Sequence, residues 1–138
     1  MFKSKDILKS FNRIVKPISN DYIAEELANV VLKNGLISIN RKNIEFILKS
    51  SETCEIYTCI TPDSDYKQIT YSYIFDDRNV YDAKYLIFIV KHNGILTKLN
   101  LSKIKDNIKW NLPNSQILLG DYIDETAKII TITVLILR

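Results

Sequence analysis

Apolar residues in the first third of the chain recur every three to four positions, which is the spacing of amphipathic helices. Residues 5–15 carry this pattern and predict a first helix that ends before Pro17. A second helix is predicted from a cap at Ser19 or Asn20 to the stop signal Asn34-Gly35. Asn40 then stands where it would cap a third helix.

The later apolar segments favour strands. Four are predicted, at 55–61, 84–91, 116–123 and 128–137, with a helix at about 100–110. Residues 67–75 fit either a strand or a helix, because their apolar positions match both periods. The short connection 124–127 predicts that the last two strands pair antiparallel. Trp110 and Leu112 are expected to complete the core beside them.

This order of elements predicts an α+β fold, with one mixed sheet and helices on a face. The composition suits a soluble domain, with 46% apolar and 25% charged residues. The net charge of +3 is spread along the chain, and no cluster of cations is denser than Arg41-Lys42. We therefore expect no nucleic-acid partner. The longest apolar stretch, 129–137, is far shorter than the ~20 residues that span a bilayer, so we expect no membrane span and a cytoplasmic protein.

The chain offers little catalytic or metal-binding chemistry. Cys54 and Cys59 lie five positions apart, which places them on opposite faces of a strand. With His92 as the single histidine, a zinc site cannot be assembled, and His92 has no apparent nucleophile partner. Aspartates at 63, 65, 76, 77 and 82 are typical of polar turns. We expect no metal, no cofactor and no enzymatic activity.

Four motifs nevertheless resemble the C-terminal domain of the FtsZ/tubulin family. Residues 34–44, N-G-L-I-S-I-N-R-K-N-I, resemble the FtsZ loop G-L-I-N-x-D-x-x-D-V. Residues 83–89, A-K-Y-L-I-F-I, fall where the family has A-x-G-x-L-x-x-I. Residues 116–125, Q-I-L-L-G-D-Y-I-D-E, resemble N-I-I-F-G-x-x-I-D-E, and I-T-I-T-V at 130–134 resembles I-x-V-T-V.

The resemblance implies a specific architecture for the predicted α+β fold. It is a two-layer sandwich in which one mixed four-stranded sheet carries helices, preceded by one or two N-terminal helices. Residues 1–34 would be a helical segment equivalent to the end of the family's central helix, and 35–138 the C-terminal-like domain, together one structural unit. The family's glycine-rich phosphate loop is missing, and three glycines cannot build one. We therefore expect a stand-alone domain without its GTPase domain.

The loop at 35–43 is the candidate site, comprising Gly35, Asn40, Arg41, Lys42 and Asn43. In FtsZ its two carboxylates reach into the nucleotide pocket of the next subunit and position the attacking water. Here the equivalent positions are Asn40 and Asn43, and neither amide can act as a base. The substitution is explained either by drift in a loop without a nucleotide partner or by retained docking, with Arg41 and Lys42 meeting phosphate.

The resemblance thus implies a non-catalytic interaction domain that caps or modulates polymers of a full-length FtsZ/tubulin-like GTPase, as part of a cytoskeleton or of cell division. Its partner would be that GTPase or a second copy of this chain. One alternative is a structural domain that self-associates through a strand edge or through its tyrosine-rich segment, which contains Tyr71, Tyr73, Tyr81 and Tyr85. The other is an excised fragment of a longer FtsZ-like protein.

Overall fold

The computed structural model of the chain describes residues 21–61 and 82–138. Its elements, in chain order, are α2 (Asp21–Leu32), α3 (Arg41–Lys49), β1 (Cys54–Thr61), β2 (Tyr85–His92), α5 (Lys98–Asn111), β3 (Gln116–Ile123) and β4 (Ile130–Leu137). These bounds agree with the predicted ones to within a few residues. The expected helix at 5–15 and the ambiguous segment 67–75 lie outside the described residues.

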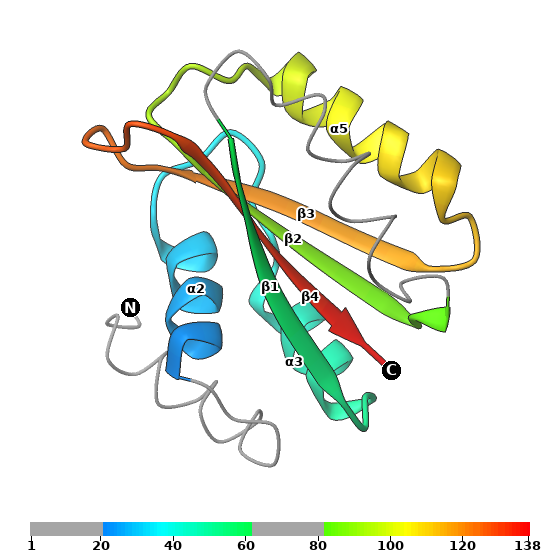
Figure 1. The fold of residues 1–138 in the computed structure, drawn as a ribbon. Helices are drawn as coiled ribbons and strands as arrows, with labels where there is room; N and C mark the ends of the chain where they lie inside the picture. The colour runs from blue at the N-terminus through cyan, green and yellow to red at the C-terminus, as the bar shows by residue number, and fades with distance from the viewer. Residues whose placement is uncertain (1–20, 62–81) are drawn as a thin grey trace.

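The four strands form one mixed sheet in the order β1-β4-β2-β3 (Figure 1). β4 runs antiparallel to both of its neighbours, β1 and β2. β2 and β3 are parallel, and α5 provides the crossover that parallel neighbours require. The predicted α+β class with a mixed four-stranded sheet is confirmed.

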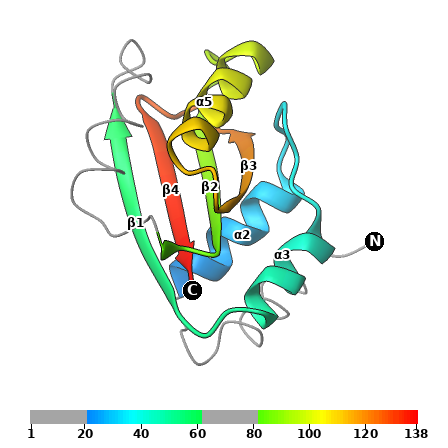
Figure 2. The ribbon, with the colours of Figure 1, turned by 90° about the vertical axis from the view of Figure 1, so that its right-hand side faces the viewer.

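Helices cover both faces of this sheet (Figure 2). On one face α5 packs through Leu101, Ile104 and Ile108. On the other face α2 and α3 pack against residues such as Ile87 and Leu135. The helices therefore form a layer on each side, one more than the two-layer arrangement that we expected. β2 and β4 are buried almost throughout, so both of their faces need a cover, which explains their continuous apolar sequences.

The predicted pairing of the last two strands is wrong. β4 lies between β1 and β2, so the chain after β3 crosses the end of β2 instead of turning back on itself. The Asp124 amide donates to the His92 carbonyl at 2.9 Å, which ties the connection to the end of β2. A short connection limits the distance between two strands, but it does not force them to be neighbours.

The predicted burial of Trp110 is also wrong. Its side chain is 86% exposed, on the side of α5 that faces away from the sheet. Leu112 is buried as expected. Within the described residues, no helix has both the length and the apolar character needed to cross a membrane.

Candidate functional site

The segment between α2 and α3 runs along the outer edge of β3. Ile37 accepts a hydrogen bond from the Asp121 amide at 3.0 Å through its carbonyl, and Asn34 accepts one from the Ile123 amide at 2.8 Å. We call residues 34–43 the docking loop, because they contain the interaction site that the sequence predicts; docking itself is a prediction. Its first part therefore extends the sheet by two backbone hydrogen bonds and covers the C-terminal half of the β3 edge.

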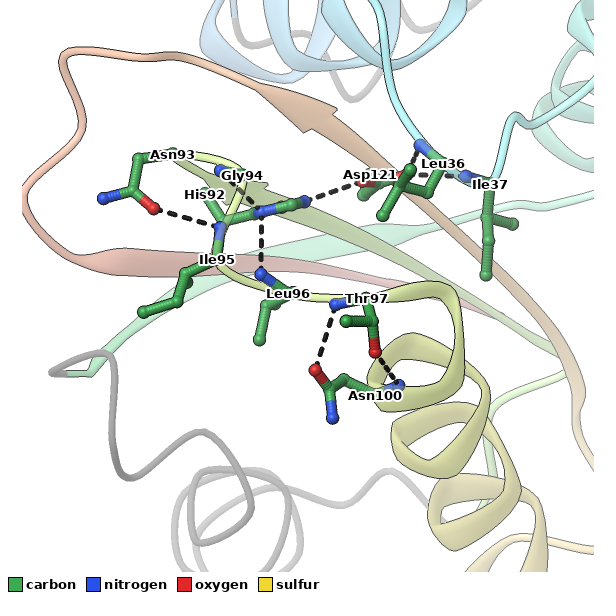
Figure 3. Close-up of polar contacts among 10 residues, drawn as sticks. All are labelled: Leu36, Ile37, His92, Asn93, Gly94, Ile95, Leu96, Thr97, Asn100 and Asp121. Carbon is green, nitrogen blue, oxygen red and sulfur yellow. Dashed lines mark hydrogen bonds and ion pairs between the residues drawn. The ribbon is translucent and has the colours of Figure 1, made fainter.

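A buried carboxylate secures the same part of the docking loop (Figure 3). Oδ1 of Asp121 accepts hydrogen bonds from the Leu36 and Ile37 amides, both at 2.7 Å. Oδ2 lies 2.7 Å from Nε2 of His92, and neither side chain is exposed to solvent. One carboxylate thus holds two loop amides and one imidazole, which leaves little of its acceptor capacity unused.

His92 also accepts hydrogen bonds from the segment that precedes α5 (Figure 3). Its Nδ1 accepts from the Gly94 amide at 3.1 Å and from the Leu96 amide at 3.5 Å. Because Nδ1 is an acceptor, we assign the ring proton to Nε2, which donates it to Asp121. Thr97 follows directly and caps α5 in a reciprocal capping box with Asn100. A continuous set of hydrogen bonds therefore joins the docking loop to the start of α5.

The charge state of Asp121 follows from these partners. Burial by itself raises the pKa of this carboxyl, but the hydrogen bond from His92 and those from the Ile37 and Leu36 amides lower it further than burial raises it. The net result is a pKa below the ordinary value, so Asp121 is a carboxylate at neutral pH.

Two glycines allow the docking loop to lie this close to the sheet. A Cβ at Gly35 would collide with the carbonyl oxygen of Asp121. A Cβ at Gly120 would lie 2.6 Å from Ile39 of the loop and 2.8 Å from Val30 of α2. Both positions therefore need glycine for its lack of a side chain, which accounts physically for Gly35 and Gly120 within the two motifs that resemble FtsZ.

The second half of the docking loop presents its predicted residues to solvent. Asn40 caps α3, and its Oδ1 accepts from the Lys42 amide at 2.7 Å. The side chains of Asn40, Lys42 and Asn43 are exposed. The Arg41 guanidinium is half-buried and forms an ion pair with Glu45, with Nε and Oε1 2.8 Å apart. The structure thus places the predicted site residues in the loop and in the first turn of α3, where Arg41 forms an ion pair with Glu45 of the same helix.

The anchor formed by His92 and Asp121 was missed from the sequence. Asp121 lies within the strand predicted at 116–123, but its role as an anchor was not predicted; its side chain is fully buried inside β3. A signal was available, because a lone aspartate within the apolar run of a strand requires buried partners. The imidazole that supplies one of them comes from the end of the neighbouring strand, 29 residues away.

A second buried polar contact joins α2 to β3. The Tyr122 hydroxyl donates to the carboxylate of Glu26, at 2.9 and 3.0 Å from its two oxygens. Burial raises the pKa of Glu26, more than the bond from Tyr122 lowers it. Burial and the nearby Glu26 likewise raise the pKa of Tyr122. This pair is structural, since both groups are buried in the interior between α2 and the sheet.

Metal ligands do not gather in the described part of the chain, where no group of three His, Cys, Asp or Glu side chains could hold an ion. Cys54 is a free thiol, and burial raises its pKa to about 11, so it is protonated and unreactive at neutral pH.

The comparisons with known proteins bear on the fold. No family profile and no curated protein matches the sequence. Among solved structures, FtsZ of M. jannaschii, an empty dimer, superposes with a TM-score of 0.71 at 17% identity over 95% of this chain and 43% of that one. CetZ1 of Haloferax volcanii, a GDP-bound monomer, gives 0.57 at 13% identity over 96% of this chain and 49% of that one. TubZ of Bacillus thuringiensis serovar israelensis, in GDP-form protofilaments, gives a TM-score of 0.52 at 10% identity over 97% of this chain and 39% of that one.

These matches confirm that the chain has an FtsZ/tubulin-like fold. The chain spans less than half the length of each of these three proteins. At such low identities the likeness concerns the fold, and it transfers no activity.

Proposed function

We propose that the chain is a non-catalytic, cytoplasmic interaction domain that docks through residues 35–43 onto an FtsZ/tubulin-like GTPase and modulates its polymer. In this proposal the docking loop binds the nucleotide face of the partner, as the resembling loop of FtsZ does between subunits. The domain would occupy one end of a filament through this loop.

The observation that carries the proposal is the rigid attachment of an exposed loop. Asp121 holds the loop through two amides at 2.7 Å, and Gly35 permits the close approach. Beyond this anchor, Asn40, Lys42 and Asn43 face solvent. A loop that is already ordered loses less conformational entropy on binding, which favours a docking role.

The chemistry of the loop argues against hydrolysis in such a complex. Asn40 uses its side-chain oxygen to cap α3, and an amide at either Asn40 or Asn43 cannot activate water. Lys42 lies at the helix N-terminus and pairs with no carboxylate of the described residues. Its ammonium and the backbone amides of the first turn favour an anion such as phosphate.

The structural neighbours supply the type of partner. FtsZ was solved as a dimer, CetZ2 of Haloferax volcanii as a GTPγS-bound protofilament and TubZ as GDP-form protofilaments. Proteins of this fold thus associate with one another, and a domain that presents one face of a subunit would stop the growth of such a filament.

Co-sedimentation with a polymerising FtsZ in GTP, with phosphate release measured in the same tubes, tests this proposal. We expect less pelleted polymer and slower turnover at substoichiometric amounts of the chain. Lys42→Glu should abolish the effect by reversing the charge at the loop. Lys103→Glu, on exposed α5 surface, is the matched control and should keep it. The double variant Asn40→Asp, Asn43→Asp should restore turnover. An unchanged polymer at excess of the chain refutes the modulating role for that GTPase.

Self-association is the second candidate, and the dimeric FtsZ structure favours it. A concentration-dependent oligomer that ignores FtsZ would support it. The third candidate is that the chain is an excised part of a longer FtsZ-like protein, in which the loop would have the same chemistry. An open reading frame that continues upstream of Met1 would identify that case.

A further inference from the structure

The turn between β2 and α5 contains one of the two Asn-Gly pairs of the chain. Asn93 and Gly94 form this pair, and both are exposed to solvent. An Asn-Gly pair can react with itself, because the glycine nitrogen can attack Cγ of the asparagine side chain and close a succinimide ring. Glycine favours the reaction, since it has no side chain to hinder the ring. The contacts around the pair decide how fast it reacts.

The nitrogen that must attack, the amide nitrogen of Gly94, is bonded to an imidazole (Figure 3). Its N–H donates to Nδ1 of His92 at 3.1 Å. A backbone carbonyl in this place would only hold the amide, since it cannot take up the proton. A neutral imidazole nitrogen can take it up, and loss of the proton makes the amide nitrogen a nucleophile. His92 is therefore positioned as a general base.

The orientation of this base is fixed from its other side. Nε2 of His92 lies 2.7 Å from Oδ2 of Asp121, and both side chains are fully buried. A carboxylate in this position keeps the ring in the tautomer whose Nδ1 accepts, and it stabilises the imidazolium that forms. The Gly94 amide, the imidazole and the carboxylate therefore have the order of nucleophile, base and orienting group that activates hydroxyl and thiol nucleophiles in enzymes.

A hydrogen-bond donor also lies at the carbonyl under attack. Oδ1 of Asn93 accepts a hydrogen bond from the Ile95 amide at 3.1 Å. This bond polarises the carbonyl and stabilises the negative charge that develops on Oδ1 as the ring closes. The turn that it closes contains both Cγ of Asn93 and the nitrogen of Gly94, so the reacting groups are held together. A Cβ at Gly94 would meet nothing within 4 Å, so the ring has room to form.

The burial of His92 and Asp121 excludes an external substrate. Neither side chain has exposed surface, so the pair can act only on groups that touch it. Nδ1 also accepts from the Leu96 amide at 3.5 Å, but the residue before Leu96 is an isoleucine, which has no carboxamide to attack. Of the two amides bonded to Nδ1, only that of Gly94 follows an asparagine.

We propose that Asn93-Gly94 is a self-modification site at which His92, oriented by Asp121, promotes conversion of the asparagine to aspartate and isoaspartate. His92 takes the proton of the Gly94 amide, and a bond forms between that nitrogen and Cγ of Asn93. The Cγ–Nδ2 bond then breaks, the proton passes to the leaving nitrogen, and ammonia departs. Water reaches the exposed turn and opens the succinimide at either carbonyl. The site reacts once, without turnover, and does not depend on the polymer role proposed above.

The second Asn-Gly pair is a control within the same chain. Asn34 and Gly35 are also exposed. His92 is the single histidine and its Nδ1 faces the turn after β2, so no imidazole serves the Gly35 amide. The Asn34 carbonyl is bonded to β3, and Gly35 lies against Asp121, which holds this pair along the strand edge. The structure therefore predicts different reaction rates for two identical dipeptides.

The test follows both pairs in the purified full chain at neutral pH, in water labelled with heavy oxygen. Labelled oxygen enters each carboxylate formed during the incubation, so conversion during a later digestion in ordinary water is not counted. Trypsin releases the two pairs in separate peptides, 34–41 and 92–98, and mass spectrometry measures the labelled fraction of each. We expect Asn93 to convert about tenfold faster than Asn34 in the folded chain, and at a similar rate in urea, where the base is not oriented.

Variants separate the action of a base from a merely structural role. His92→Gln keeps a hydrogen-bonding side chain that cannot take up a proton at neutral pH, so conversion of Asn93 should slow about tenfold. A structural role predicts the opposite, because a loosened turn samples the reactive geometry more often. Asp121→Asn should likewise slow Asn93, although it loosens the loop at Asn34. Leu99→Ala, at an exposed position of α5, is the control and should leave both rates unchanged.

Two results would overturn the proposal. One is conversion of Asn93 no faster than that of Asn34 in the folded chain, which would mean that the hydrogen bond to His92 protects the amide. The other is unchanged or faster conversion of Asn93 in His92→Gln. If that variant does not fold, the comparison of the original chain with and without urea decides, since equal rate ratios in the two states contradict a base oriented by the fold. Fast conversion of Asn93 beside an unchanged FtsZ polymer would refute only the polymer role.

Discussion

Replacing Asp121 by asparagine should loosen the docking loop from the sheet while nearly preserving side-chain volume. Asparagine has one acceptor oxygen and one NH₂ group, whereas the native carboxylate accepts on both sides. If the asparagine oxygen still accepts hydrogen bonds from the Leu36 and Ile37 amides, the asparagine NH₂ group faces the Nε2 proton of His92. Moving that proton to Nδ1 would set it against the Gly94 amide instead. Every arrangement leaves a buried donor without an acceptor.

The size of the effect follows from these contacts. Leaving one buried donor unsatisfied costs about 1–3 kcal/mol, and the loss of charge-assisted character in the remaining bonds adds to it. We therefore expect the free energy of unfolding to fall by roughly 3 kcal/mol. With an unfolding entropy of about 2.1 cal/mol/K per residue, a chain of this size should lose roughly 10 °C in Tm.

Urea denaturation followed by circular dichroism measures this change, with thermal unfolding as a second readout. Asp124→Asn is the matched control, because that carboxylate is exposed at the surface and bonds within its own turn to Thr126. A loss for Asp121→Asn no larger than that of the control would refute the anchoring role of the carboxylate.

The same variant has a defined pH dependence. The pKa of Asp121 is lower in the folded chain than its ordinary value. A carboxylate of this kind stabilises the fold above its unfolded pKa of about 3.9, and the contribution is lost as the pH falls through the folded pKa. The stability gap between the original chain and Asp121→Asn should therefore be full at neutral pH and narrow below about pH 4. A gap that stays constant down to pH 2 would contradict the assignment.

Three further predictions concern the loop and the interior. Gly35→Ala should destabilise the fold by about 1–3 kcal/mol, because its Cβ would collide with the Asp121 carbonyl; denaturation with unchanged m-value checks it. Asn40→Ala should cost about 1 kcal/mol through loss of the α3 cap, whereas Asn40→Asp should retain stability, and equal losses in thermal unfolding would contradict this. The pKa of Glu26 is raised in the folded chain, so its contribution to stability is greatest below the unfolded value and is lost as pH rises. Glu26→Gln should therefore gain stability over the original chain from pH 4 to pH 7, measured by denaturation at each pH.

Local pattern was enough to locate the elements. The strand predicted at 116–123 has those bounds in the structure, and the helix predicted at about 100–110 is α5 at 98–111. Asn40 caps α3 as predicted, since a cap depends on a side chain and an amide two residues away. These features depend on neighbours in the chain, so the sequence alone contains the information.

The candidate site was predictable only in part. The candidate loop was singled out by its motif, because Gly35 and Asn40 to Asn43 are consecutive or nearly so, and its docking role stays a prediction. Its anchor was not found, because Asp121 meets the loop across 84 and 85 residues and meets His92 across 29. No local signal pairs residues at such separations, and the burial that makes the contact strong exists only in the folded chain.

Along the described residues, periodicity and turn residues were sufficient to predict which segments are helices and strands, and which of them carry a continuous apolar core. The position of β4 between β1 and β2, the helices on both faces of the sheet and the exposure of Trp110 could be read only from the folded chain. The physical reason is that strand order and burial depend on how apolar faces far apart in the chain are covered together. The periodicity of any one segment reports only that it has such a face.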